Sequence, residues 1–145
     1  MPSATPRLQG FARRLLALEA ASVNPRGTRD SAFRVCEKLR QPLSALAGVA
    51  GFRALLSRAL VLANGEVRWL KAVRIDAQGS LEGLDEVRAG LSPKEIAEGE
   101  TVLVARLIGL LVTFIGEALT LRLMQDIWPQ ISSRDLGSEM EKDNG

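Results

Sequence analysis

The amino-acid sequence predicts a mainly α protein, a helical bundle with one minor β element. Its 145 residues fit a single compact domain, and a hydrophobic content of 46% is enough for a core. Aromatic residues make up only 4%, so the apolar side chains are mostly Leu, Ala and Val, a mixture that favours helices over sheets. Apolar residues also recur at spacings of three and four along much of the chain. We therefore expect one helical domain over residues 1–129 and a flexible C-terminal tail over 130–145.

The first helix is expected over residues 7–22, before the helix-breaking sequence Asn24-Pro25-Arg26-Gly27. Its apolar residues share one face and its arginines avoid that face, which describes a basic amphipathic helix. The apolar residues are Leu8, Phe11, Leu15 and Leu18, and the arginines are Arg7, Arg13 and Arg14. We expect this helix to dock on the core, and the alternatives are a transit peptide or a helix on a membrane surface.

The second helix is expected over residues 31–63, with Asp30 or Ser31 as its cap. A stripe of apolar residues runs along it and ends before Asn64-Gly65. The stripe comprises Phe33, Cys36, Leu39, Leu43, Leu46, Ala50, Leu56, Leu60 and Ala63. Pro42 lies inside this helix and lacks a backbone donor, so we expect a kink there, because the apolar spacing resumes beyond it.

Residues 66–82 favour a small β-hairpin or an ordered loop, because β-branched and aromatic residues precede a turn sequence at Asp76-Ala77-Gln78-Gly79. The strongest local signal follows in Ser92-Pro93-Lys94-Glu95. Serine caps a helix, proline suits its first position, and glutamate reaches back to the cap. We expect the helix that begins there to continue over residues 93–127, up to Trp128-Pro129.

Residues 101–124, TVLVARLIGLLVTFIGEALTLRLM, are nearly as apolar as a membrane-spanning helix. A span needs about 20 apolar residues, and a charge near its centre is costly. Arg106 and Glu117 interrupt this segment, so we expect a helix of a protein core instead. At about 100° per residue, its small and polar residues share one narrow face or its margin. These residues are Ala105, Arg106, Gly109, Thr113, Gly116, Glu117 and Thr120.

We predict that this face is an interface, because small residues let a second backbone approach closely. Arg106 and Glu117 lie about 16 Å apart along one helix and cannot pair within it. Across the two-fold axis of an antiparallel homodimer, the same two residues would pair twice. The alternatives are that each charge meets the 31–63 helix of its own chain or reaches solvent.

Residues 37–48 read EKLRQPLSALAG, in which a proline follows a charged, leucine-containing turn. This stretch resembles the H-box helix of histidine-kinase dimerisation domains. The matching residues are Leu39, Arg40, Pro42 and Leu43. Glu37 stands where that family has its phosphorylated histidine, and no nucleotide-binding domain follows. The resemblance implies a helical hairpin that dimerises into a four-helix bundle without phosphotransfer.

The sequence gives no catalytic, metal or cofactor signature. It contains no histidine, so Ser-His-Asp and Cys-His catalytic arrangements and zinc sites built from Cys and His are excluded. The acidic clusters are expected to be solvated faces, and Gly48 to Gly51 lack the features of a phosphate-binding loop. Cys36 is the only cysteine, and we interpret it as a small buried hydrophobe. We therefore predict a protein without catalytic activity, cofactor or metal.

Charge is divided unevenly between the two halves of the chain. Residues 1–74 hold 13 Lys and Arg against 4 Asp and Glu, whereas residues 75–145 hold 6 against 13. The halves can attract one another, within one chain or between copies, or the basic half can bind an anionic partner.

The favoured function is a non-catalytic helical module for homodimerisation or partner binding, of the adaptor or regulatory type. A nucleic-acid-binding protein and a membrane-associated helical protein are the alternatives. The single cysteine and the lack of a recognisable signal peptide suit a cytoplasmic protein.

Overall fold

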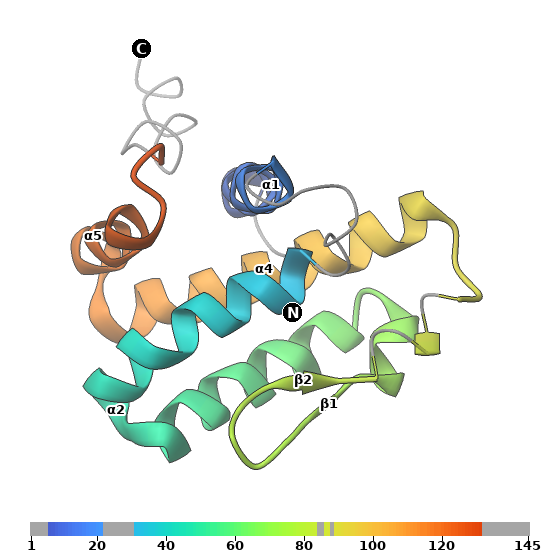
Figure 1. Ribbon diagram of the computed structural model, residues 1–145, viewed down its shortest axis with the longest axis horizontal. Coiled ribbons are helices and arrows are strands. Elements are labelled where there is room, and N and C mark those ends of the chain that lie inside the picture. The colour runs from blue at the N-terminus through green and yellow to red at the C-terminus, as the bar shows by residue number, and fades with distance from the viewer. Residues whose placement is uncertain (1–5, 22–30, 84–85, 88, 132–145) are drawn as a thin grey trace.

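The chain forms a bundle of helices with a short β-hairpin, as the sequence predicts (Figure 1). This computed structural model describes residues 6–21, 31–83, 86–87 and 89–131. Its elements are α1 (Pro6–Ala21), α2 (Ser31–Asn64), the 3-10 helix η2 (Arg68–Ala72), β1 (Arg74–Ile75), β2 (Leu81–Glu82), α4 (Pro93–Ile115) and α5 (Glu117–Ile127). Helix α4 extends along the molecule and packs against both α1 and α2.

Helix α2 is broken at Gly48, which has φ 83° and ψ 162°, so the chain reverses there into a helical hairpin (Figure 1). The expected kink at Pro42 is wrong in position, because Pro42 lies within the regular first half. A positive φ with extended ψ is accessible almost only to glycine. Pro42 removes one hydrogen bond, whereas the break at Gly48 lets the second half fold back against the first.

Helix α4 begins at the predicted capping box. The Ser92 hydroxyl accepts a hydrogen bond from the Glu95 amide at 3.1 Å, and the Glu95 carboxylate accepts one from the Ser92 amide at 2.9 Å. The expected continuous helix over 93–127 is wrong, because Gly116 has φ 90° and ψ 158° and separates α4 from α5. Residues beyond Gly116 therefore do not continue the faces of α4.

The predicted hairpin forms after η2, with strands of two residues each. Arg74 pairs with Glu82 and Ile75 with Leu81, in antiparallel register. The Asp76 carboxylate holds the turn by accepting hydrogen bonds from the Gln78 and Ser80 amides, both at 2.9 Å. The hairpin therefore forms at the turn residues that the sequence singles out.

Trp69, in η2, fixes the start of α4 by lying on Gly99. Its indole Nε1 donates to the Glu95 carbonyl at 3.1 Å. A β-carbon placed on Gly99 would lie 2.2 Å from Cζ2 of Trp69, so no larger residue fits there. The segment after α2 is thereby tied to the first turns of α4.

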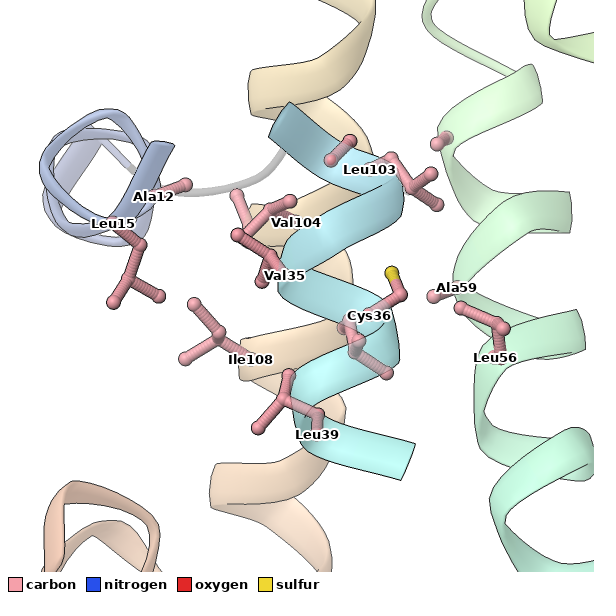
Figure 2. Packing of buried hydrophobic residues seen from close by; sticks show 14 of the residues in the cluster. Ala12, Leu15, Val35, Cys36, Leu39, Leu56, Ala59, Leu103, Val104 and Ile108 are labelled. Carbon is pink, nitrogen blue, oxygen red and sulfur yellow. The ribbon is translucent and has the colours of Figure 1, made fainter. Parts of the chain in front are cut away.

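The core lies where α1 and the two halves of α2 meet α4 (Figure 2). From α1, Ala12 and Leu15 point toward α4. Cys36, in the first half of α2, faces Ala59 in the second half and is buried, as predicted. Such close approach between the two halves of α2 needs small side chains at both positions.

The packed chain continues past the predicted domain end at residue 129. Trp128 and Ile131 are buried, and Gln125 Nε2 donates to the Ile131 carbonyl at 3.3 Å. The start of the predicted tail is therefore part of the core. The rest of that tail, residues 132–145, lies outside the described residues.

Candidate docking surface

At Gly109, the small-residue face of α4 is covered by α1 of the same chain. Ala105 is fully buried. A β-carbon on Gly109 would lie 3.1 Å from Cδ1 of Leu8, so Gly109 makes room for α1. At Gly109 the close contact is therefore made by α1 of the same chain.

Arg106 also forms an ion pair within its own chain. Its Nε and Nη2 lie 2.8 and 2.7 Å from Glu66 Oε2, and the side chain is only 9% exposed. A carboxylate of another copy could reach this guanidinium only by displacing Glu66. Within one chain Arg106 thus forms its ion pair with Glu66, two residues after the end of α2, and its pairing with Glu117 across a two-fold axis stays a prediction.

The remaining residues of the predicted interface are divided by the break at Gly116. Thr113 donates to the Gly109 carbonyl at 3.1 Å, and the buried Thr120 donates to the Gly116 carbonyl at 2.7 Å. Glu117 lies 3.5 Å from Arg7 of α1. Only Thr113, Gly116 and Glu117 are exposed, so the seven predicted residues do not form one contact surface.

A buried carboxylate that sequence reasoning missed joins three parts of the chain. Glu19 of α1 is fully buried and accepts hydrogen bonds from Trp128 Nε1 at 3.0 Å and from Arg34 Nε at 3.2 Å. Lys38 Nζ lies 3.0 Å from Oε1 of Glu19, the oxygen that also accepts from Trp128, whereas Arg34 contacts Oε2. The sequence does contain a signal for this burial. Glu19 lies four residues after Leu15, so both residues fall on the apolar face of α1.

Burial tends to raise the pKa of Glu19, but the Trp128, Lys38 and Arg34 contacts outweigh it, so the pKa lies below its ordinary value. The carboxylate is thus ionised and its partners are residues of its own chain. This arrangement fixes α1, the first half of α2 and the segment after α5 together.

Other chemically reactive groups are few in the part of the chain that the structure describes. Burial raises the pKa of Cys36 to about 12, with smaller contributions from Glu37 and Glu100, so its thiol is not a nucleophile near neutral pH. No group of three or more Cys, Asp or Glu side chains there is arranged to hold a metal ion.

An open groove of about 850 Å³ lies between α1, the segment after α2 and the first turns of α4. Its charged lining includes Arg13 and Lys94 as well as Glu66, Glu98 and Glu100. Both signs of charge thus border the groove, and this mixture singles out no ligand chemistry.

The exposed large hydrophobic side chains are concentrated elsewhere. Among the described residues, five such side chains are exposed: Leu46 (57%), Val49 (52%), Val61 (65%), Phe114 (59%) and Leu119 (43%). All but Val61 lie within three residues of Gly48 or Gly116. Figure 1 shows the reversal within α2 and the junction between α4 and α5 at the same end of the long axis. We call residues 45–50 and 114–119 the apolar end of the molecule.

Comparison of the chain with protein-family models, curated proteins and solved structures gives no match. The resemblance of residues 37–48 to an H-box helix therefore stays a prediction. The apolar end is the candidate docking surface, because it combines exposure with an apolar character that folding alone does not use.

Proposed function

We propose that this protein is a non-catalytic helical binding module of the adaptor or regulatory type, which associates with its partner through the apolar end. The observation that carries the proposal is the exposure of Leu46, Val49, Phe114 and Leu119, each within three residues of one of the two glycine breaks. Neighbouring exposed apolar side chains typify association surfaces in soluble proteins.

The energetics of these side chains favour association. Full burial of one such side chain contributes about 1.5–3 kcal/mol. Because the four side chains are only 43–59% exposed, covering all of them offers about 3–6 kcal/mol in total before the entropy cost of association is subtracted. A reversible contact is therefore expected, with an affinity that depends on what surrounds the apolar residues.

The non-catalytic part of the proposal rests on residue chemistry. The sequence lacks histidine, its single thiol is buried, and its buried carboxylate Glu19 is occupied by three residues of its own chain. The lone cysteine also suits a cytoplasmic location. A second copy is the simplest protein partner, and it would meet the apolar end rather than the α4 face.

The test uses a double variant, Leu46→Gln with Val49→Gln, and Val61→Gln as the matched control at a distant exposed position. Binding of the apolar dye anilinonaphthalene sulfonate, native mass and urea unfolding are measured for each. We expect the native wild type to bind the dye, the double variant to lose most of that binding, and all three proteins to be equally stable.

Two results would overturn the proposal. The first is a native wild type that neither binds the dye nor associates. The second is a double variant destabilised by more than about 1 kcal/mol, which would make Leu46 and Val49 part of the packing of the fold.

A further inference from the structure

The two halves of α2 meet at one residue, with no loop between them. Helical residues run on both sides of Gly48, and within α2 only Gly48 departs from helical geometry, with φ 83° and ψ 162°. Antiparallel helices are ordinarily joined by loops of about 2–5 residues. The reversal seen in Figure 1 therefore depends on a single backbone position, which we call the hinge.

Gly51 is required by the reversed form of α2 but not by a straight helix. A β-carbon placed on Gly51 would lie 2.8 Å from Cβ of Ala47, closer than two such carbons approach in proteins. In a regular helix, the β-carbons of residues four positions apart are separated by about 5–6 Å. The reversal thus brings Ala47 onto Gly51. A side chain at residue 51 fits a straight helix and does not fit the hairpin.

The residues around the hinge suit a continuous helix. The apolar spacing of three and four runs from Leu43 through Leu46 to Ala50, across Gly48. Alanine and leucine, the commonest residues of this stretch, are strong helix formers. No atom lies within 4 Å of a β-carbon placed on Gly48, so no neighbouring group holds the hinge closed. The reversed form is therefore maintained by packing between the two parts of the chain that the hinge joins.

These two parts hold one another through contacts that do not involve the hinge. Residues before Gly48 form α1 and the first half of α2, and residues after it form the other elements. Trp128 Nε1 donates to Glu19 at 3.0 Å, and the Ser80 hydroxyl donates to Glu37 at 2.7 Å. Each of these bonds joins one part to the other. The same bonds would form equally well between the first part of one copy and the second part of another.

Straightening of α2 would make such an exchange necessary. A continuous helix of 34 residues is about 50 Å long, so it would carry its second half away from its first half. Both parts would then expose the core that they share in the monomer. A second straightened copy covers both, because the two copies carry identical surfaces and can exchange identical elements about a two-fold axis.

We propose that this protein has a second folded form, a domain-swapped dimer in which α2 is straight. In it, the segment after Gly48 packs against the segment before Gly48 of the other copy. The contacts of the core are kept and only the hinge changes, so release of the short hinge in each chain offsets part of the entropy cost of association. This inference does not use the apolar end as a docking surface, and it stands apart from the proposed function.

The test begins with wild type refolded from urea at low and at high protein concentration, since the parts exchange while they are separated. Gel filtration with light scattering measures monomer and dimer. We expect a dimer after refolding at high concentration, with the helical circular dichroism of the monomer. The isolated dimer should persist on dilution, because its return to monomer requires the core to open. A dimer joined only through exposed surfaces would re-equilibrate rapidly.

Variants of the hinge should shift the equilibrium in opposite directions. Gly48→Ala with Gly51→Ala strains the hairpin and favours the straight helix in both chains, so the dissociation constant of the dimer should fall by about a hundredfold or more. The matched control is Gly10→Ala, a helical position without a close neighbour or a positive φ, which should leave the constant unchanged. Insertion of Gly-Ser-Gly-Ser after Gly48 supplies a loop, and should give less dimer than the wild type.

Wild type that refolds only to monomer at high concentration would overturn the inference, and so would a dimer that re-equilibrates as soon as it is diluted. A folded double alanine variant with no more dimer than the wild type would also contradict it. If that variant does not fold, the insertion decides, because a dimer that the insertion leaves unchanged does not arise from the hinge. Dye binding by the native monomer is a separate measurement, so the proposed function stands or fails independently.

Discussion

Trp128 donates its indole proton to Glu19 at 3.0 Å, which joins two residues 109 positions apart in the chain. The bond is buried, and Arg34 and Lys38 complete the surroundings of the carboxylate. An ionised group in a core is stable only when such partners replace water. Ionised Glu19 can therefore be buried in this way only when the segment after α5, which carries Trp128, is in place.

Replacing Glu19 by glutamine should lower the free energy of unfolding by about 2–3 kcal/mol, because glutamine keeps the shape but loses three charge-assisted contacts. Urea unfolding at neutral pH measures the loss. The control is Glu98→Gln at an exposed position, for which a change within about 0.5 kcal/mol is expected. Equal effects of the two substitutions would contradict a special role for the buried site.

The effect of Glu19 should depend on pH in a defined direction. Its pKa is lowered on folding, so ionised Glu19 stabilises the fold above the ordinary carboxyl pKa of about 4.3. That contribution disappears as the pH falls through the lower pKa of the folded state. The stability difference between wild type and Glu19→Gln should thus be constant near neutral pH and shrink below about pH 4. A difference that grows on acidification would refute the assignment.

Gly99→Ala should destabilise the protein by about 1–3 kcal/mol, because the new methyl group would overlap the indole of Trp69. The matched control is Gly10→Ala in α1, where no atom lies within 4 Å of the new methyl group. Alanine there should stabilise the helix by about 0.5–1 kcal/mol. Thermal unfolding of both variants gives the comparison, and changes of the same sign would be inconsistent with the packing of Trp69.

Gly116→Ala should cost about 1–3 kcal/mol, although no atom lies within 4 Å of the added methyl group. The penalty comes from φ 90°, which alanine adopts only under strain. Gly90→Ala, an equally open position without a positive φ, is the control. If both variants have the stability of the wild type under urea unfolding, the break at Gly116 is not required by the fold.

The two charges of the predicted interface should differ sharply in their effect on stability. Arg106→Met leaves Glu66 without the guanidinium that binds it, and should cost about 3 kcal/mol. Glu117→Gln removes a half-exposed ion pair with Arg7 and should change stability by less than about 1 kcal/mol. Neither substitution should alter the native mass, which light scattering measures. A loss of dimer in either variant would restore the predicted α4 interface.

The elements predicted well are those whose signals are local. The capping box of Ser92 and Glu95 and the turn at Asp76 satisfy their own backbone groups within a few residues, so the sequence alone reveals them. The breaks at Gly48 and Gly116 were not predicted, because glycine inside a helix costs only about 1 kcal/mol. Packing between distant segments decides whether such a glycine stays helical.

The candidate site was predicted less well for the same reason. The small residues around Gly109 correctly indicated a close helix contact, but spacing within one helix cannot tell α1 from a second copy. Helical spacing does not reveal the break at Gly116. Glu117 and Thr120 were therefore predicted to share a face with α4, although they belong to α5. Exposure of Leu46 and Phe114 depends on which faces the bundle leaves uncovered, and only the assembled fold determines that.

The bond between Glu19 and Trp128 also has a consequence for synthesis on the ribosome. A nascent chain that has emerged as far as Arg122 holds α1, α2 and α4, yet it lacks the indole that helps bury the Glu19 carboxylate. Such a chain would keep that carboxylate hydrated and α1 loosely attached. Completion of the fold is thus delayed until Trp128 becomes available, and products cut short before it should be recognised readily by cellular proteases.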